Sequence, residues 1–389
     1  MSGPHKSLHV MMLAGEASGD AHAAEVVERL RALSPGIRIS GMGSERMKAA
    51  GVDLFFDSAS IAVVGIVEVL RHWGEIRQAM RRVEQQLEQQ RPDLLVLVDY
   101  PEFNLKMARH AKALGIPVVF YISPQVWAWR PKRIHRIGAS IDHMAVLFRF
   151  EETFYRKAGI PVTWVGHPLV DKVRSEVPPD DEKARLGIAS GQRVVGLFPG
   201  SRRSEIQRLL PLLLDTAERL HRRRPELHFL LPVAETLDFD AIERQCAARK
   251  LPLTLTRDRL YDVIPVCDAI ASCSGTVTLE IALLETPLCI VYRMAALSWL
   301  IMSRLVTIEH IGLANIVGAD GAVRELLQKD ATPERIGAEI EALLDDPDHR
   351  NRVIEGLRKV RKNLGEGDGA GRMAHLVLRM ASGDAVQEA

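Results

Sequence analysis

A carboxylate at the end of an apolar run is the first candidate for chemistry in this sequence. Asp99 directly follows the run 94–98 (LLVLV), and Pro101 then stops the strand that this run predicts. At the mouth of a sheet a carboxylate is partly removed from water, which raises its pKa and makes it a better general base for a hydroxyl nucleophile. Asp99 is therefore the first candidate catalytic residue. The alternative is that its side chain caps a helix near residue 102.

A Gly-rich turn, residues 15–20 (GEASGD), holds the second candidate, between a predicted strand and a predicted helix. Backbone N–H groups at a helix start can bind an anion or a sugar hydroxyl. Glu16 stands at the carboxyl end of the strand, where a side chain faces a ligand cleft rather than the core. The alternative is a tight turn in which Ser18 or Asp20 caps the helix.

Two further loops have the pattern of a diphosphate site. Residues 198–205 (FPGSRRSE) and 272–280 (SCSGTVTLE) each end a strand in Gly and hydroxyl residues just before a helix. The free N–H groups and the positive end of each helix dipole can stabilise a diphosphate leaving group, and Arg202 or Arg203 can add bidentate contacts. Ordinary helix capping is the alternative for each loop. The candidate phosphate and ribose contacts are Gly200, Ser201, Arg202, Ser274, Gly275, Thr276 and Glu280.

Another loop combines aromatic and cationic side chains. Trp127 and Trp129 stand beside three cations, the first of which is Arg130, in the run 123–133. Aromatic faces with neighbouring cations suit a sugar ring or a lipid phosphate. The alternative is that the two tryptophans pin the loop to its domain.

Two segments are more apolar than a single core contact requires. Residues 61–70 and 297–306 carry apolar side chains on more than one helical face. The surplus could contact acyl chains or a bilayer surface; a helix buried on two sides is the alternative. The most apolar stretches, 61–70 and 281–306, are interrupted by charged residues, so neither has the roughly 18 uncharged residues of a membrane span; the charges are Glu68, Glu285, Arg293 and Arg304. The candidate lipid contacts are Val63, Val64, Ile66, Trp299 and Ile301.

No metal and no cofactor are expected. The spacing Asp238-Phe239-Asp240 can hold a divalent ion on a diphosphate, but here it opens a predicted surface helix, where the dipole favours Asp. The four cysteines show no C-x-x-C spacing, and two of them lie in strand-like runs. Buried free thiols are therefore predicted.

Parallel sheets must position these residues. Short apolar runs alternate with amphipathic stretches in two successive series, which predicts strands joined by crossover helices. The predicted fold class is α/β, with two doubly wound, Rossmann-like domains that face a central cleft, because such sheets bind ligands at the carboxyl ends of their strands. The predicted domains are residues 1–168 and 169–346, and C-terminal helices in 347–389 could pack back on the first domain.

Composition limits the partners. The 389 residues are 47% apolar, enough for two cores, and 51 basic residues against 50 acidic ones leave a net charge of +1. Nucleic acid, which binds through bulk charge, is therefore not an expected partner. The apolar run near the amino terminus is too short for a signal peptide. A cytoplasmic protein that contacts a membrane surface is expected.

Six runs, taken in order, resemble the signature motifs of one family. GEASGD, VDYPEFNL, SPQVWAWRPKRI, VGHPL, FPGSRRSEI and SGTVTLEIALLETP are similar to those of the lipid-A-disaccharide synthase family, collinear over residues 9–330. The WAWRP and SGTVTLE runs are the most specific. The resemblance implies an inverting GT-B glycosyltransferase that joins UDP-2,3-diacylglucosamine to 2,3-diacylglucosamine 1-phosphate. The implied products are a β(1→6) disaccharide 1-phosphate and UDP.

The resemblance also implies roles for single residues. Glu16 and Asp99 would lie in the sugar-facing active site, with the acceptor and lipid bound by the first domain. The second domain would bind the UDP-sugar, and the implied place of action is the inner face of the inner membrane. A homodimer is left open. The implied donor contacts are Arg202 and 274–276 at the phosphates, Glu280 at the ribose, and Asn315 and Gln328 nearby.

One segment departs from the family pattern. After Ile-Gly-Leu the family usually reads Pro-Asn, then a Gly-Arg-Glu run and Pro-Glu-Leu; this chain has Ala314-Asn315, then GADG at 318–321 and REL at 324–326. The roles of the family's Arg-Glu pair are not carried over, so donor contacts on this loop are left open.

Two other classes share part of the pattern. A UDP-sugar 2-epimerase on the same fold would use the diphosphate loops but needs neither an acyl-binding surface nor an acceptor site. A non-enzymatic sugar-binding protein is disfavoured by the cysteine pattern and by the absence of a signal peptide.

Overall fold

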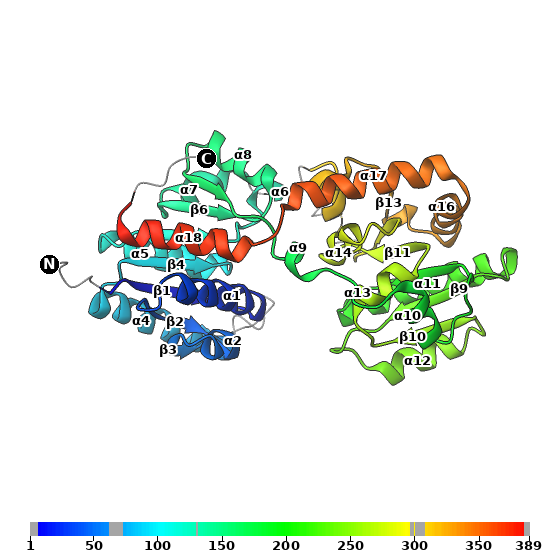
Figure 1. Cartoon of the computed structure of the whole chain (residues 1–389), viewed down its shortest axis with the longest axis horizontal. Coiled ribbons are helices and arrows are strands. Elements are labelled where there is room, and N and C mark those ends of the chain that lie inside the picture. Colours follow the sequence, from blue (N-terminus) through cyan, green and yellow to red (C-terminus); the bar gives the residue numbers. More distant parts are fainter. Residues whose placement is uncertain (1–6, 62–72, 130, 296–298, 300–307, 385–389) are drawn as a thin grey trace. The chain divides into compact units, whose positions relative to one another are not determined.

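The chain folds into two compact units. The computed structural model describes residues 7–61, 73–129, 131–295, 299 and 308–384. Unit 1 comprises Met1–Pro168 and Gly367–Ala389, and unit 2 comprises Leu169–Glu366. Figure 1 shows a sheet flanked by helices in each unit.

Unit 1 is built on a parallel sheet. Among the described residues its strands follow the order β3-β2-β1-β4-β5-β6-β7. The strands are β1 (His9–Ala14), β2 (Arg38–Gly43), β3 (Asp53–Asp57), β4 (Leu94–Val98), β5 (Val118–Tyr121), β6 (His143–Val146) and β7 (Val162–Trp164). The helices are α1 (Ala17–Leu33), α2 (Glu45–Ala49), η1 (Ser58–Ile61), α4 (Trp73–Gln90), α5 (Pro101–Ala113), α6 (Val126–Trp129), η2 (Pro131–Arg133), α7 (Ile134–Gly138), α8 (Arg149–Lys157) and α18 (Gly369–Ser382).

The central strands of this sheet are buried throughout because helices cover both faces, and apart from His9 and His143 their residues are hydrophobic. Every residue of β1, β4, β5 and β6 is buried. Helix α18, from the end of the chain, packs beside α1 (Figure 1). Its Arg372 donates a hydrogen bond from Nε to the Val165 carbonyl at 2.8 Å. Helix α18 and strand β1, from opposite ends of the described chain, therefore belong to the same unit.

Unit 2 repeats this architecture. Its described strands follow the order β10-β9-β8-β11-β12-β13, all parallel. They are β8 (Val194–Phe198), β9 (His228–Pro232), β10 (Leu253–Thr256), β11 (Ala269–Cys273), β12 (Leu288–Tyr292) and β13 (Glu325–Leu327). The helices are α9 (Leu169–Lys172), α10 (Pro179–Arg185), α11 (Arg203–Arg223), α12 (Phe239–Ala247), α13 (Leu260–Val263), η3 (Ile264–Val266), α14 (Val277–Leu283), η4 (Asn315–Ala319), η5 (Gln328–Asp330), α16 (Pro333–Asp345) and α17 (Pro347–Leu364).

The two doubly wound sheets confirm the α/β class predicted from the sequence. The C-terminal helices differ from the sequence-based division, which placed all of 347–389 in one segment. Helix α17 belongs to unit 2, where it packs on α14, and α18 belongs to unit 1. A short turn at 365–368 separates the two helices. The amphipathic pattern of each helix predicts that one face is buried, but it does not predict which of the two sheets that face covers.

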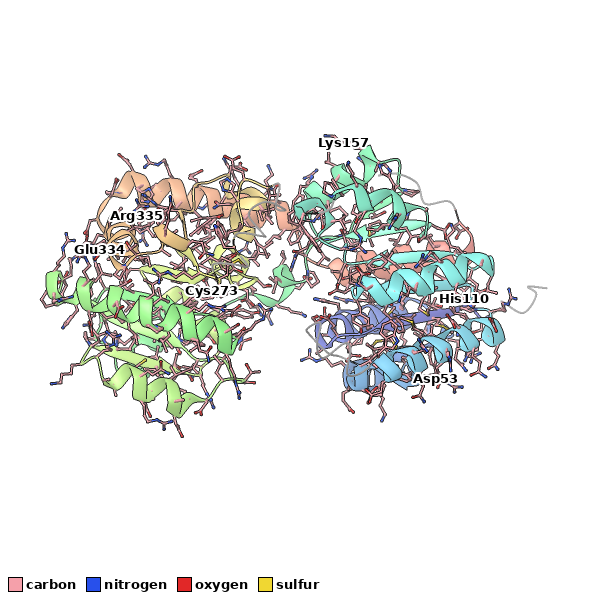
Figure 2. All side chains as sticks on the ribbon, turned by 180° about the vertical axis from the view of Figure 1, so that it is seen from behind. Asp53, His110, Lys157, Cys273, Glu334 and Arg335 are labelled. Atoms are coloured by element: carbon pink, nitrogen blue, oxygen red, sulfur yellow. The ribbon has the colours of Figure 1, made fainter. Side chains whose placement is uncertain are left out.

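The cysteines are buried free thiols, as predicted. Cys273, at the end of β11, lies inside unit 2, whereas the charged Lys157 and Glu334 stand at the surface (Figure 2). Burial raises the pKa of the Cys273 thiol to about 12, so this thiol stays protonated and unreactive at neutral pH.

Gly41 offers a test of how closely β1 and β2 approach. It pairs with Met12, and a methyl group added at Gly41 would overlap the Met12 carbonyl of the neighbouring strand. We expect Gly41→Ala to lower the free energy of unfolding by about 2–3 kcal/mol, because backbone must move. Gly36→Ala is the matched control: open space surrounds Gly36, so the change should stay within about 0.5 kcal/mol. Urea unfolding of the full chain measures both; equal stabilities would contradict the packing argument.

Candidate functional site

Each sheet has one point where the strand order reverses. In unit 1 it lies between β1 and β4, and in unit 2 between β8 and β11. Ligands of doubly wound folds bind outside the carboxyl ends of strands at such points. Glu16 and Asp99 follow β1 and β4, and the two Gly-hydroxyl loops follow β8 and β11. The structure therefore brings the predicted residues to two strand-order reversals.

The two carboxylates in unit 1 are both shifted toward the protonated form. Burial raises the pKa of Asp99, and a hydrogen bond from the Tyr100 backbone only partly offsets this. Burial, and then the charge of Asp99, raises the pKa of Glu16. A carboxylate with a raised pKa is a stronger base, so this pair can accept a proton from a hydroxyl.

The backbone at Asp99 is strained. Asp99 and Tyr100 both have φ of +50°, in the left-handed region that non-glycine residues rarely adopt. Tyr100, whose side chain makes no capping hydrogen bond, is the N-cap of α5, so the helix-capping alternative for Asp99 is wrong. Asn104 donates from its amide to the Asp99 carbonyl at 2.6 Å and to the Val98 carbonyl at 3.2 Å, which holds the turn. Such strain is concentrated at functional sites.

The Gly-rich turn is shaped by its neighbour Tyr100. A Cβ at Gly15 would overlap the Tyr100 ring, so only glycine fits there. Neither Ser18 nor Asp20 caps α1, whose N-cap is Glu16 without a side-chain hydrogen bond. The capping alternative is therefore wrong here too, and exposed Ser18 lies on the first turn of α1.

The Asp20 carboxylate instead caps a different helix. It accepts hydrogen bonds from Ser44 N at 2.6 Å and Arg46 N at 3.0 Å, at the start of α2. No local sequence pattern predicts this contact, because Asp20 and Ser44 are 24 positions apart in the chain.

Trp127 and Trp129 have different surroundings. Trp127 donates from Nε1 to the buried Glu151 carboxylate at 3.0 Å, so it pins its loop to α8, as the alternative reading proposed. Trp129 is 36% exposed. Arg130 lies outside the described residues.

Glu151 is the centre of this contact. It is 2% exposed and also accepts a hydrogen bond from Phe148 N at 3.2 Å. Burial raises its pKa to about 7 despite the hydrogen bonds from Phe148, Trp127 and Ser123, which lower it. Sequence reasoning missed Glu151, since a Glu at the start of a helix is ordinarily exposed.

A pocket of about 500 Å³ opens at the strand-order reversal of unit 2. Both predicted loops line it, together with the end of β9 and the segments that directly follow β9 and β10. Burial raises the pKa of Glu280, and a hydrogen bond from Tyr261 lowers it. Seven of the nine predicted donor contacts lie here: Gly200, Ser201, Arg202, Ser274, Gly275, Thr276 and Glu280.

The start of α11 already holds a carboxylate. Glu205 Oε2 accepts from Ser201 N at 3.0 Å and Arg202 N at 3.1 Å, and its Oε1 pairs with the Arg202 guanidinium at 3.0 Å. The capping alternative therefore applies to this loop, whose N–H groups are engaged inside the protein. The start of α14 differs, because its N-cap Thr276 makes no side-chain capping bond. An anion in this pocket would meet the N–H groups of 274–276 first.

The contacts that Asn315 and Gln328 make lie within unit 2. Asn315 is 2% exposed and donates to the Val323 carbonyl at 2.8 Å and to Glu325 Oε1 at 2.7 Å. The Gln328 amide is placed to pair with the backbone of Met294. In the part of the chain that the structure describes, neither Asn315 nor Gln328 lines the pocket.

The segment 257–261 was missed by sequence reasoning. Arg257, Asp258 and Arg259 line the pocket between β10 and α13, and Tyr261 donates to Glu280 Oε1 at 3.1 Å. The sequence pattern that could have predicted them is a charged run directly after a strand, because such a run lies at the same edge of the sheet as the predicted loops.

Asp238 is the N-cap of α12 and accepts from Ala241 N at 3.1 Å, which confirms the helix-start prediction for the D-x-D spacing. Trp299 is half-buried. Val63, Val64, Ile66 and Ile301 lie outside the described residues. Within the ranges that the structure describes, no helix is both long and apolar enough to cross a bilayer.

Sequence comparisons point to one family. A family model described as lipid-A-disaccharide synthetase matches residues 10–372. A lipid-A-disaccharide synthase of Geobacter sulfurreducens is 48% identical over 374 residues, 96% of this chain and 97% of that protein. A protein of the same name from Nitrosococcus oceani is 46% identical over 375 residues, 96% and 97% of the two chains.

Solved structures share the fold at low sequence identity. A putative UDP-N-acetylglucosamine 2-epimerase of Listeria monocytogenes has a TM-score of 0.65 and 10% identity, covering 98% of this chain and 100% of its own. The calicheamicin glycosyltransferase CalG4 has a TM-score of 0.60 and 16% identity, covering 97% and 99%. These likenesses show the fold alone, the GT-B architecture of two doubly wound units that the sequence predicted.

Glu151 gives stability a pH dependence. A carboxyl whose pKa is higher in the folded chain stabilises the fold at low pH, and this stability is lost as pH rises from about 4.5 toward about 7. We expect the parent to lose up to roughly 3 kcal/mol over this window from this group. Glu151→Gln should flatten the profile, whereas Glu152→Gln, on the same helix, should keep it. Urea unfolding at several pH values measures this; parallel profiles for the parent and Glu151→Gln would contradict it.

Proposed function

The chain belongs to the lipid-A-disaccharide synthetase family, and on that premise we propose that it transfers 2,3-diacylglucosamine from UDP to 2,3-diacylglucosamine 1-phosphate. It is a glycosyltransferase of lipid A biosynthesis. The proposed products are the β(1→6) disaccharide 1-phosphate and UDP. The observation that carries the proposal is the pair of raised-pKa carboxyls, Glu16 and Asp99, at the strand-order reversal of unit 1.

The pocket of unit 2 is the proposed donor site. Its volume of about 500 Å³ suits a nucleoside diphosphate. The diphosphate would accept hydrogen bonds from the backbone of 274–276, where no capping side chain competes at the start of α14. Arg202 can exchange its ion pair with Glu205 for a phosphate oxygen, since its side chain is 80% exposed. Glu280 would accept hydrogen bonds from the ribose hydroxyls.

The proposed reaction is a direct displacement. The 6-hydroxyl oxygen of the acceptor attacks the anomeric carbon from the face opposite UDP, so one C–O bond forms while the bond to the diphosphate breaks. UDP leaves with the electron pair, and the configuration inverts. The hydroxyl proton passes to the carboxylate pair, with Asp99 as first candidate and Glu16 beside it. Burial of both carboxyls supports this role because it raises their basicity.

Two tryptophans are candidate lipid contacts. Of the apolar candidates, Trp129 is exposed and Trp299 half-buried, and exposed indole rings suit a bilayer interface. We propose peripheral binding at the inner face of the inner membrane. Sedimentation with anionic phospholipid vesicles tests the binding, and light scattering tests whether the free protein is a homodimer.

A UDP-sugar 2-epimerase is the second candidate, because an epimerase shares the fold. One assay separates the two. UDP-2,3-diacylglucosamine is incubated with the chain, with and without the 1-phosphate acceptor, and the products are read by mass spectrometry. A disaccharide 1-phosphate that forms only with acceptor supports the transferase. An acceptor-independent isomer of the donor would refute it.

The same assay tests metal dependence. We expect turnover to be the same within about two-fold in EDTA and in Mg²⁺, because the start of α14 and Arg202 can neutralise the leaving diphosphate. Loss of all turnover in EDTA, restored by Mg²⁺, would contradict this expectation.

Asp99→Asn tests the general base. The change keeps the shape of the side chain but removes its basicity, so we expect kcat to fall at least about 10²-fold while UDP affinity is unchanged. In the parent, activity should fall as pH drops through the raised pKa of the carboxylate pair. Glu102→Gln, a nearby exposed carboxylate paired with Arg133, should retain activity.

Two results would count against Asp99 as the base. An Asn variant with more than about a tenth of the parent activity would refute it. Loss of UDP affinity together with turnover would instead point to structural damage rather than to missing acid–base chemistry.

A further inference from the structure

Glu280 has a protein partner of its own. The Tyr261 hydroxyl donates a hydrogen bond to Glu280 Oε1 at 3.1 Å. Glu280 lines the donor pocket, whereas Tyr261 is not among the described residues that line it. Tyr261 therefore contacts the Glu280 carboxylate from outside the pocket. It can affect the binding of a ligand in the pocket only through Glu280.

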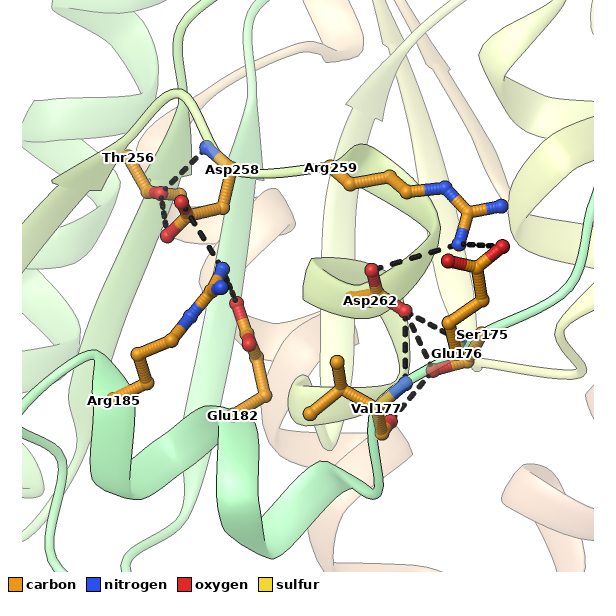
Figure 3. A network of polar contacts seen from close by, with 9 residues as sticks. All are labelled: Ser175, Glu176, Val177, Glu182, Arg185, Thr256, Asp258, Arg259 and Asp262. Atoms are coloured by element: carbon orange, nitrogen blue, oxygen red, sulfur yellow. Dashed lines mark hydrogen bonds and ion pairs between the residues drawn. The ribbon is translucent and has the colours of Figure 1, made fainter.

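The Tyr261 ring is itself held in place by a cation. The guanidinium of Arg259 lies over this ring, 5.4 Å from its centroid. The same guanidinium pairs with Glu176 at 3.0 Å and with Asp262 at 3.7 Å (Figure 3). Two carboxylates thus fix the cation that covers the ring.

Asp262 anchors this group to the rest of unit 2. Its Oδ1 accepts hydrogen bonds from Ser175 Oγ at 3.0 Å, Glu176 N at 2.6 Å and Val177 N at 3.2 Å. Burial alone would raise the pKa of Asp262, but these hydrogen bonds lower it overall, so it stays charged. The start of α13 is therefore tied to the segment 175–177, and Tyr261 has a fixed position from which to donate.

We propose that Tyr261 is a positioning residue for the nucleotide: its hydroxyl fixes Glu280 so that the second carboxylate oxygen faces the vicinal hydroxyls of a ribose. This inference rests on the proposed function, in which the pocket binds UDP. A carboxylate without such a partner rotates among several orientations, and ordering it would reduce the affinity for the ligand.

The protonation state of Glu280 supports the same role. Burial raises the pKa of Glu280, and the hydrogen bond from Tyr261 lowers it, so the hydroxyl favours the charged, accepting form. Burial and Glu280 raise the pKa of Tyr261 to about 12, so it remains a donor at neutral pH. The other charged groups that line the pocket are Arg202, Glu205, Glu235, Arg257, Asp258 and Arg259.

The test compares UDP with 2′,3′-dideoxy-UDP by calorimetry of the full chain. We expect Tyr261→Phe to weaken UDP binding about five- to ten-fold, the size of one ordinary hydrogen bond, because the lost bond acts on the ligand only through Glu280, and to leave binding of the dideoxy analogue unchanged. In the background of Glu280→Gln, Tyr261→Phe should have little further effect. The loss of UDP affinity on acidification should begin at a higher pH in Tyr261→Phe than in the parent.

Two variants control for damage to the fold. Tyr155→Phe removes a hydroxyl that bonds Ser123 at 3.0 Å in unit 1, and it should leave UDP affinity unchanged. Tyr261→His keeps a ring and a donor and should recover part of the lost affinity. Thermal melting of each variant checks that it is folded.

The outcomes separate this inference from the function it rests on. Unchanged UDP affinity in Tyr261→Phe, or equal losses for UDP and the dideoxy analogue, would overturn the positioning role alone. A Glu280→Gln variant that binds UDP like the parent would overturn the ribose assignment and this inference with it. A parent that does not bind UDP would overturn the donor site as a whole.

Discussion

Parallel strands covered by helices on both faces leave little room for polar side chains along their length. In both units the polar groups that could do chemistry stand just beyond the carboxyl ends of strands, where the order of the sheet reverses. Asp99 and Glu280 illustrate the result, since burial raises the pKa of each carboxyl although each stands beyond the end of its strand. The rest of the fold holds these few positions in place.

Sequence reasoning found this framework because strand periodicity and Gly-hydroxyl loops are local patterns. It also placed Asp99 and Glu16 at neighbouring strand ends, since both directly follow apolar runs. It could not find contacts that join distant segments: Asp20 caps a helix 24 residues away, and Tyr261 reaches Glu280 across 19 residues. Nor could it find that the Asn315 amide, which the family resemblance implies near the donor, donates hydrogen bonds to Val323 and Glu325 within unit 2.

Three carboxyls, one buried and two partly exposed, have different roles in the two units. Glu151 joins a tryptophan loop to a helix, and its proton is held until about neutral pH. Glu205 fills the start of α11 and holds Arg202, so an incoming anion would have to displace an internal pair. Glu280 accepts a hydrogen bond from Tyr261, which is not among the described residues that line the pocket. The donors around each group therefore decide its role: Glu151 makes a structural contact, Glu205 competes with a ligand, and Glu280 is a proposed ligand contact.

The path of the chain has a consequence for biosynthesis. Unit 2 is an insertion within unit 1, because α18 returns from residue 367 onward to pack on α1. A ribosome makes the N-terminal end first, and domains generally fold as units during synthesis. Here the first-made sheet must wait for the last helix, with the apolar face of α1 uncovered while almost 200 residues of unit 2 emerge and fold. The N-terminal unit, although its sheet is translated first, can therefore be completed only after unit 2 and α18 have been made.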